Sequence, residues 1–297
     1  MSHASWLWAL FTVIAAASQT IRNATQRELT VTLGTVGATH VRFLFGLPFA
    51  LVFLALVVFA TSYSLPHPSF VYWGWLLGGA LAQIAATALM LAAMNDRSFV
   101  VVYAYIKTEP VQVALFGLVL LGDPVTPSMA LAILLATCGV LIVGLRPGAA
   151  RSTRATLLGL GAGAMFGLSA IAFRGAILSL GLVDYLLAAT FTMGTGLLAQ
   201  AALLSLYLWL HDPDVMRAIF RAWQPSMLAG FLGALASQFW FLAFALATAA
   251  SVRTLALVEI LFAQAISHFV FRQPTTPREG CGIALIVIGV GLLIWVY

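Results

Sequence analysis

The sequence predicts an all-α polytopic membrane protein of ten transmembrane helices, arranged as an inverted repeat of two five-helix units. Of the 297 residues, 62% are hydrophobic and only 8% are charged. A soluble domain carries about 25% charged residues, so this chain cannot present a water-facing surface of ordinary polarity. Its apolar runs lack the alternation of barrel strands, so helices are the expected way for it to span a bilayer.

Apolar runs of about 20 residues, the length that crosses a bilayer as a helix, can be placed at ten positions. They cover residues 5–22, 35–60, 70–93, 98–121, 128–145, 155–175, 184–209, 225–248, 251–271 and 279–297. The connections are short, and no G-x-x-x-x-G-K-[ST] loop is present to bind ATP. The first run has no Lys or Arg ahead of it, so we expect it to remain as a helix instead of being cleaved as a signal peptide.

Two stretches of the chain repeat one pattern at an offset of 150 positions. The first consists of Glu109, Pro124-Val125-Thr126-Pro127 and Gly139, and the second of Glu259, Pro274-Thr275-Thr276-Pro277 and Gly289. Repeats of this size in an apolar chain are typical of transporters built from two copies of one helical unit. We place the copies at residues 1–148 and 149–297. Because five helices per copy is an odd number, the second copy enters the membrane from the opposite side.

Two short motifs resemble the drug/metabolite transporter superfamily, specifically its EamA-type ten-helix carriers. They are Gly122-Asp123-Pro124, ahead of a glycine-spaced apolar helix, and Arg42-Phe43-Leu44 in the second run. Asp123 and Gln273 stand where that family usually has glutamate. The resemblance covers the whole chain through the five-plus-five layout. It implies a central cavity lined by helices of both halves, alternating access, and small metabolites as cargo.

The arginines predict which side of the membrane holds the termini. The side opposite the termini collects Arg22, Arg27, Arg97, Arg146, Arg151, Arg154, Arg217, Arg221, Arg272 and Arg278, whereas the terminal side has Arg174 and Arg253. Short loops rich in arginine stay in the cytoplasm, so this imbalance places both termini in the periplasm. The family resemblance implies the reverse orientation.

Glu109 and Glu259 lie near the middle of the fourth and ninth runs. An ionised carboxylate at that depth is expensive unless it is paired or hydrated. Such a group either faces a water-filled cavity and binds a cation or an amine, or takes up a proton and carries it. The alternative is a glutamate that a neighbouring helix satisfies in a purely structural role.

Lys107 is the only lysine in the chain, two positions before Glu109. On a continuous helix the two side chains would point about 200° apart, so they would not neutralise each other. If both reach the cavity, Lys107 can receive a carboxylate while Glu109 or Glu259 receives an ammonium, which suits a zwitterion such as an amino acid. The alternative is a structural ion pair between Lys107 and Glu259.

Further residues in the apolar runs are candidates for contact with substrate. They are Tyr103 and Tyr105 in the fourth run, Gln83 and Gln238 after the matching segments Gly79-Ala80-Leu81-Ala82 and Gly233-Ala234-Leu235-Ala236, and Trp240. Glutamines can hydrogen-bond a substrate, and an aromatic face can hold an ammonium group. Taken singly, each is more often a packing or helix-bridging residue. Pro110 breaks a backbone hydrogen bond beside Glu109 and predicts a kink that serves gating.

The sequence therefore predicts a secondary active transporter of the cell inner membrane. We expect it to export small metabolites such as amino acids or related amines by alternating access, with proton coupling through Glu109 and Glu259. Alternatives are an importer of choline-like cations or other small metabolites, a lipid-carrier flippase, and a membrane enzyme. The expected partners are the small-molecule substrate, the lipid bilayer and protons, in a monomer or homodimer. We expect no nucleic acid, cofactor, metal or catalytic residue, because the net charge of +5 comes from loop arginines and no such constellation is evident.

Overall fold

The computed structural model describes residues 6–96, 99–145, 152–181, 184–262, 264 and 276–296, and every regular element in those ranges is helical. Seven helices of this part are long and apolar enough to cross a membrane. They are Thr32–Thr61, Phe70–Met94, Pro127–Gly144, Thr153–Ser179, Tyr185–His211, Trp223–Leu246 and Pro277–Val296, with a shorter apolar helix at Leu7–Arg22. The prediction of a polytopic helical membrane protein is thus confirmed. The count of ten and the inversion of the repeat stay predictions.

The first two apolar runs are not separated by the loop that the sequence predicted. Instead α1 (Leu7–Leu44) continues through that region, with non-helical backbone at Gly34, where φ is 67° and ψ is −178°. A positive φ is readily available only to glycine, so Gly34 redirects the chain without a loop. The following helix is α2 (Leu47–Thr61). Arg22 lies inside α1 and is buried, so counting it among the loop arginines was wrong.

The fourth and ninth runs are both interrupted immediately before their glutamate. The single helix expected over 98–121 is two helices, α4 (Phe99–Ile106) and α5 (Glu109–Leu120). Pro110 lies in the first turn of α5 and has no N–H to offer the Ile106 carbonyl. In the ninth run, α11 (Ala249–Leu255) passes into a 3₁₀ turn, η1 (Ala256–Val258), and the helix resumes at Glu259. The end of this run, residues 265–271, lies outside the described residues.

The chain divides into two compact units, and each draws on both halves of the sequence. Unit 1 comprises Met1–Ile84 with Ala172–Leu246, and unit 2 comprises Ala85–Ile171 with Ala247–Tyr297. Two helices, α3 (Phe70–Asp96) and α7 (Thr153–Ser179), each begin in one unit and end in the other. A division by packing differs from a division by duplication, so the predicted repeat units 1–148 and 149–297 stay predictions.

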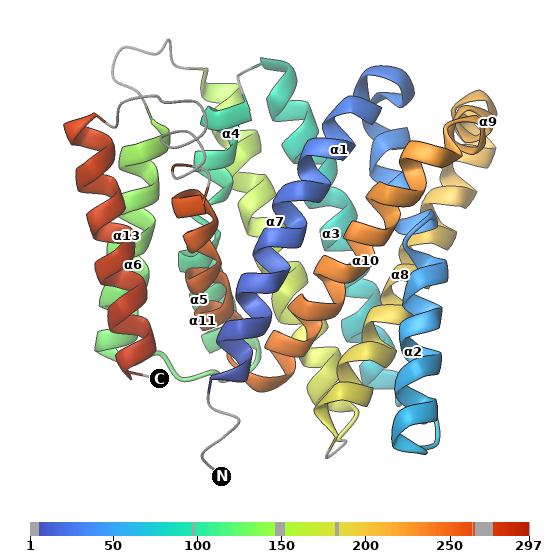
Figure 1. The fold of residues 1–297 in the computed structure, drawn as a ribbon, viewed down its shortest axis with the longest axis horizontal. Helices are drawn as coiled ribbons and strands as arrows, with labels where there is room; N and C mark the ends of the chain where they lie inside the picture. Colours follow the sequence, from blue (N-terminus) through green and yellow to red (C-terminus); the bar gives the residue numbers. More distant parts are fainter. Residues whose placement is uncertain are drawn as a thin grey trace. The chain divides into compact units, whose positions relative to one another are not determined.

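Unit 1 contains α1 and α2 together with α8 (Tyr185–His211), the short helix α9 (Pro213–Arg221) and α10 (Trp223–Leu246). Helix α1 packs along α10, as Figure 1 shows. Gly46 and Gly230 allow the backbones to touch, because a Cβ on Gly230 would lie 2.5 Å from the carbonyl carbon of Phe45. Small residues at such crossings are typical of helices that associate in lipid.

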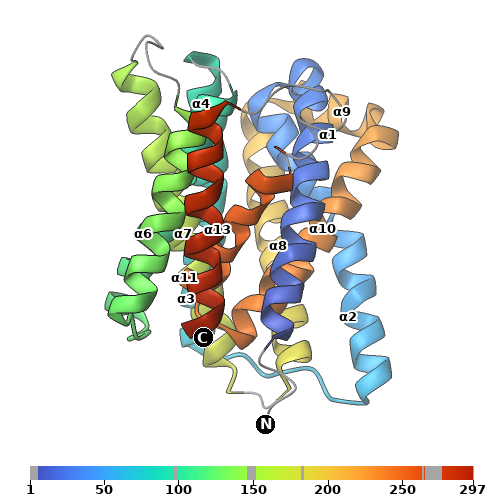
Figure 2. The same ribbon diagram turned by 60° about the vertical axis from the view of Figure 1, so that its left-hand side comes forward.

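Unit 2 contains α4, α5 and α11 together with α6 (Pro127–Gly144) and α13 (Pro277–Val296). Helices α6 and α13 run side by side in both views of the ribbon (Figures 1 and 2). A Cβ on Gly139 would lie 2.5 Å from the carbonyl oxygen of Gly282, and a Cβ on Gly289 would lie 2.7 Å from that of Ala132. At these glycines, the backbone of one helix therefore packs directly against the backbone of the other. Helix α5 packs against α11, which brings the two interruptions into one region of this unit.

Candidate functional site

Four charged side chains of unit 2 meet at the two helix interruptions: Lys107, Glu109, Arg253 and Glu259. Lys107 follows the last residue of α4, and Glu109 is the first residue of α5. Arg253 lies in the last turn of α11, and Glu259 directly follows η1. The group holds two positive and two negative charges, so it is neutral as a whole. The interruptions create the site, because each places one cation before, and one carboxylate after, a turn of non-α backbone.

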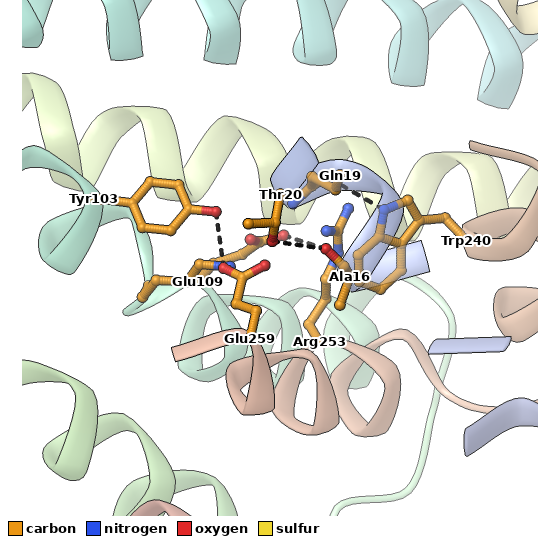
Figure 3. Close-up of polar contacts among 9 residues, drawn as sticks. Ala16, Gln19, Thr20, Tyr103, Glu109, Trp240, Arg253 and Glu259 are labelled. Atoms are coloured by element: carbon orange, nitrogen blue, oxygen red, sulfur yellow. Dashed lines mark hydrogen bonds and ion pairs between the residues drawn. The ribbon is translucent and has the colours of Figure 1, made fainter. Parts of the chain in front are cut away.

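Glu259 is held by two donors on one of its oxygens. The Tyr103 hydroxyl donates a 2.8 Å hydrogen bond to Oε1 of Glu259, and the Lys107 ammonium forms an ion pair with the same oxygen. Figure 3 shows the Tyr103 hydroxyl pointing to this carboxylate. Nζ of Lys107 also lies 4.9 Å from the centre of the Tyr103 ring, within cation–π range. The three side chains therefore form a closed group in which each contacts the other two.

Glu109 is paired with Arg253. Nε of Arg253 lies 3.1 Å from Oε1 of Glu109, and Figure 3 draws these two side chains together. This distance makes the contact an ion pair, but its geometry is not that of a hydrogen bond. This arrangement corrects the sequence analysis, which placed Arg253 among the arginines at one membrane surface. Its side chain is only 11% exposed.

In both groups, a residue of one half of the sequence contacts the glutamate of the other half. Tyr103 stands six positions before Glu109 and contacts Glu259, while Arg253 stands six positions before Glu259 and contacts Glu109. Each of these donors thus reaches the glutamate of the other half. Lys107 has no such counterpart, because Leu257 occupies the matching position.

The energetic cost of disturbing this group is large. Removing one partner of a buried ion pair leaves an unpaired charge in a medium of low polarity, at a cost of about 3–5 kcal/mol. All four charges therefore stay paired unless a group of the same charge, or a proton, takes the place of a partner. Among the interpretations of Lys107, the structure shows its ion pair with Glu259, which also explains why Lys107 and Glu109 do not neutralise each other.

The two candidate glutamines belong to unit 1 and bridge helices. Oε1 of Gln83 accepts a 2.7 Å hydrogen bond from Nε2 of Gln200, and Nε2 of Gln238 donates a 2.7 Å hydrogen bond to Oγ1 of Thr190. Both partners lie on α8. These contacts give each glutamine a packing function in unit 1, and their role toward substrate stays a prediction.

The remaining aromatic candidates also have partners of their own. In unit 1 the indole Nε1 of Trp240 donates to Oε1 of Gln19 at 3.2 Å, as Figure 3 shows. In unit 2 Tyr105 packs on the backbone of α7, where a Cβ on Gly159 would lie 2.8 Å from Cβ of Tyr105. The interruption between α4 and α5 separates Tyr105 from Glu109. Of the predicted site residues, the structure therefore brings Tyr103, Lys107, Glu109 and Glu259 together.

A multi-pass helical membrane protein with a buried, charge-balanced group at interrupted helices is the class that these observations define. Residues 6–145 match the model of the EamA-like transporter family. This match over the first part of the chain confirms the resemblance to EamA-type carriers of the drug/metabolite transporter superfamily. Its members are small-molecule transporters.

No curated protein sequence matches the chain. Among solved structures, 28 chains are similar. One of them, a protein whose structure was determined by crystallography, has a TM-score of 0.71 and 16% sequence identity to this chain. The alignment covers 100% of this chain and 99% of the matched chain. At this level of identity the likeness shows a common fold and carries no information about cargo.

Proposed function

We propose that the protein is a secondary active transporter that exports small metabolites, namely amino acids or related amines, across the cell inner membrane. Transport proceeds by alternating access in a monomer or homodimer, with proton coupling through Glu109 and Glu259. The observation that supports this proposal is the pairing of two buried carboxylates with a buried lysine and a largely buried arginine in otherwise apolar helices. Intramembrane charges are costly, and they are typical of substrate and proton pathways.

The charges restrict what can enter such a site. A carboxylate that gives up its cationic partner needs another cation or a proton, and a cation that gives up its carboxylate needs another anion. An amine can take the place of a cation beside either glutamate, and an amino acid brings one charge of each sign. A proton bound to a glutamate neutralises it directly. Amine cargo and protons therefore compete for the same carboxylates, which is the basis of coupled exchange.

We further propose that ten helices form two inverted five-helix units, residues 1–148 and 149–297. Contacts between α6 and α13 support this arrangement. Gly139 faces Gly282, and Gly289 faces Ala132, and each member of the second pair is offset by 150 positions from a member of the first. A twofold axis relating the halves produces such reciprocal contacts. The halves should then superpose after rotation about an axis in the membrane plane, with the two glutamates at equivalent sites.

A binding screen tests the class of cargo. Purified protein in detergent should show a raised melting temperature with amino acids or primary amines and none with nucleosides. Choline, whose quaternary ammonium has no N–H to donate to a carboxylate, should have a smaller effect than a primary amine. A shift with choline alone would favour the import of choline-like cations, and a shift only with polyprenyl phosphates would favour a flippase.

The orientation of the chain is a separate prediction. Leaving out the buried Arg22 and the ion-paired Arg253 keeps the imbalance, because nine arginines remain on one side against Arg174 on the other. We therefore expect both termini in the periplasm. A C-terminal alkaline phosphatase fusion should be active and a C-terminal green fluorescent protein fusion dark. The opposite pair of results would place the termini in the cytoplasm.

A further inference from the structure

We infer that the Arg253–Glu109 pair is the binding site of a zwitterionic cargo. The carboxylate of the cargo binds Arg253, and its ammonium binds Glu109. The group of Lys107, Glu259 and Tyr103 lies beside this pair and does not contact this cargo. This assignment rests on the proposed function and deepens it, because it names the form of the cargo and the residues that distinguish it.

The contacts of the two glutamates are unequal. Oε1 of Glu259 receives both the Tyr103 hydroxyl and the Lys107 ammonium, although its Oε2 has no hydrogen-bond partner among the described residues. Oε1 of Glu109 is in ion-pair contact with Arg253 without a hydrogen bond. A charge-assisted hydrogen bond is shorter and stronger than a charge contact without alignment. Cargo that replaces a partner of Glu109 therefore gives up less than cargo that replaces a partner of Glu259.

Burial follows the same order as the contacts. The side chains of Arg253 and Glu109 are 11% and 7% exposed, and those of Lys107 and Glu259 are 7% and 3% exposed. The difference between the partners of the two glutamates originates in the sequence, because Leu257 occupies the position in the second half that Lys107 occupies in the first. The ammonium of Lys107 makes its direct ion pair with Glu259. The direct ion-pair partner of Glu109 is Arg253, which lies on α11, whereas Glu109 begins α5.

Arg253 has the chemistry that a carboxylate needs. A guanidinium is a planar fork that binds both oxygens of a carboxylate, which an ammonium cannot do. The contact with Glu109 uses Nε on one edge of that fork. When a zwitterion enters, it replaces the ion pair between Arg253 and Glu109 by two new ion pairs. Arg253 then pairs with the cargo carboxylate, and Glu109 pairs with the cargo ammonium. The net charge of the site stays zero, and no charge is left unpaired.

This assignment differs from the role that the sequence suggested for Lys107. The ammonium of Lys107 is already engaged by Glu259 and by the face of the Tyr103 ring. A cargo carboxylate at Lys107 would have to displace both Glu259 and the cation–π contact. The two assignments predict opposite effects of mutation on the preference for amino acids over amines.

The test compares amino acids with the amines that lack their carboxylate. The probes are L-alanine, L-leucine and L-phenylalanine, each with its matched amine, ethylamine, isoamylamine and phenethylamine. Binding is measured by calorimetry on the full chain, and uptake in proteoliposomes. The key variant is the double substitution Glu109→Gln, Arg253→Gln, which removes both charges and leaves no buried charge unpaired. Its affinity for the preferred amino acid should fall by about 10- to 100-fold. Arg253→Gln alone should abolish the preference for the amino acid over its amine.

Two controls separate binding from folding. Arg217→Gln removes an exposed arginine of α9, with a side chain 70% exposed, and should leave both affinity and preference unchanged. Lys107→Met with Glu259→Gln should lower the melting temperature but keep the preference for the amino acid. Loss of preference in that variant, with preference kept in Arg253→Gln, would move the cargo carboxylate to Lys107 and overturn the inference. Equal affinity of the wild type for amino acids and amines would also overturn it, while leaving amine transport intact. A wild type that moves none of the probes would reject the proposed function itself.

Discussion

Replacing both buried glutamates, Glu109→Gln and Glu259→Gln, should abolish transport driven by a pH gradient. A glutamine has the shape of a protonated glutamate but cannot release or take up a proton, so the coupling cycle stops. Exchange of substrate for substrate, measured at saturating concentration, should persist. The measurement is flux in proteoliposomes with and without an imposed pH gradient. Full pH-driven flux in the double variant would reject the proton role and leave the glutamates as structural residues.

A matched variant guards this result against misfolding. The double substitution leaves Lys107 and Arg253 without carboxylates, at a cost of about 3–5 kcal/mol for each broken pair, so the melting temperature must be measured first. Glu109→Asp keeps an ionisable group at the same position and should retain part of the pH-driven flux. If Glu109→Asp and Glu109→Gln are equally inactive although both are folded, position 109 requires the length of glutamate and not its proton.

The second large effect should follow from Gly289→Leu. A Cβ at this position would lie 2.6 Å from the backbone nitrogen of Ala136 and 2.7 Å from the carbonyl oxygen of Ala132, and backbone atoms cannot move aside as a flexible side chain can. We expect α6 and α13 to be forced apart, with a loss of stability of about 3 kcal/mol. The melting temperature of the purified protein and its folded yield should both fall. Gly139→Leu, at the matching position of α6, should have a similar effect.

The control lies on the same helix. Gly291 has no neighbouring atom within 4 Å of the position that a Cβ would take, so Gly291→Leu should change stability by no more than about 0.5 kcal/mol. Equal melting temperatures for Gly289→Leu and Gly291→Leu would show that the close approach of α6 and α13 does not limit stability.

The fold class was accessible from sequence because hydropathy is a local property. Twenty apolar residues in a row predict a membrane helix whatever lies next to them in space. The described helices cover the described part of those runs, although α1 continues from the first run into the second and the fourth and ninth runs are interrupted. The motifs around Gly122 and Arg42 were likewise sufficient for the family. The paired glutamates were found by their offset, which needs no structure.

The partners of those glutamates were not accessible in the same way. Geometry at 100° per residue assumes a continuous helix, and the interruptions after Ile106 and at Ala256–Val258 break that assumption just where the charges lie. Arg253 near the end of an apolar run resembles a surface charge until its partner in the other half is known. One signal was present: Arg253 stands 150 positions after Tyr103, so an offset applied to all polar residues would have included it.

The interruption between α4 and α5 has a further consequence for the charges beside it. The aligned peptide dipoles of a helix leave roughly half an elementary positive charge at its first turn and half a negative charge at its last turn. Glu109 begins α5, and Lys107 directly follows α4 and donates its backbone N–H to the Tyr103 carbonyl. Each side chain therefore stands at the helix end of opposite sign. If cargo takes the place of Arg253, as we propose, the backbone itself still compensates Glu109, which the middle of an unbroken helix would not do.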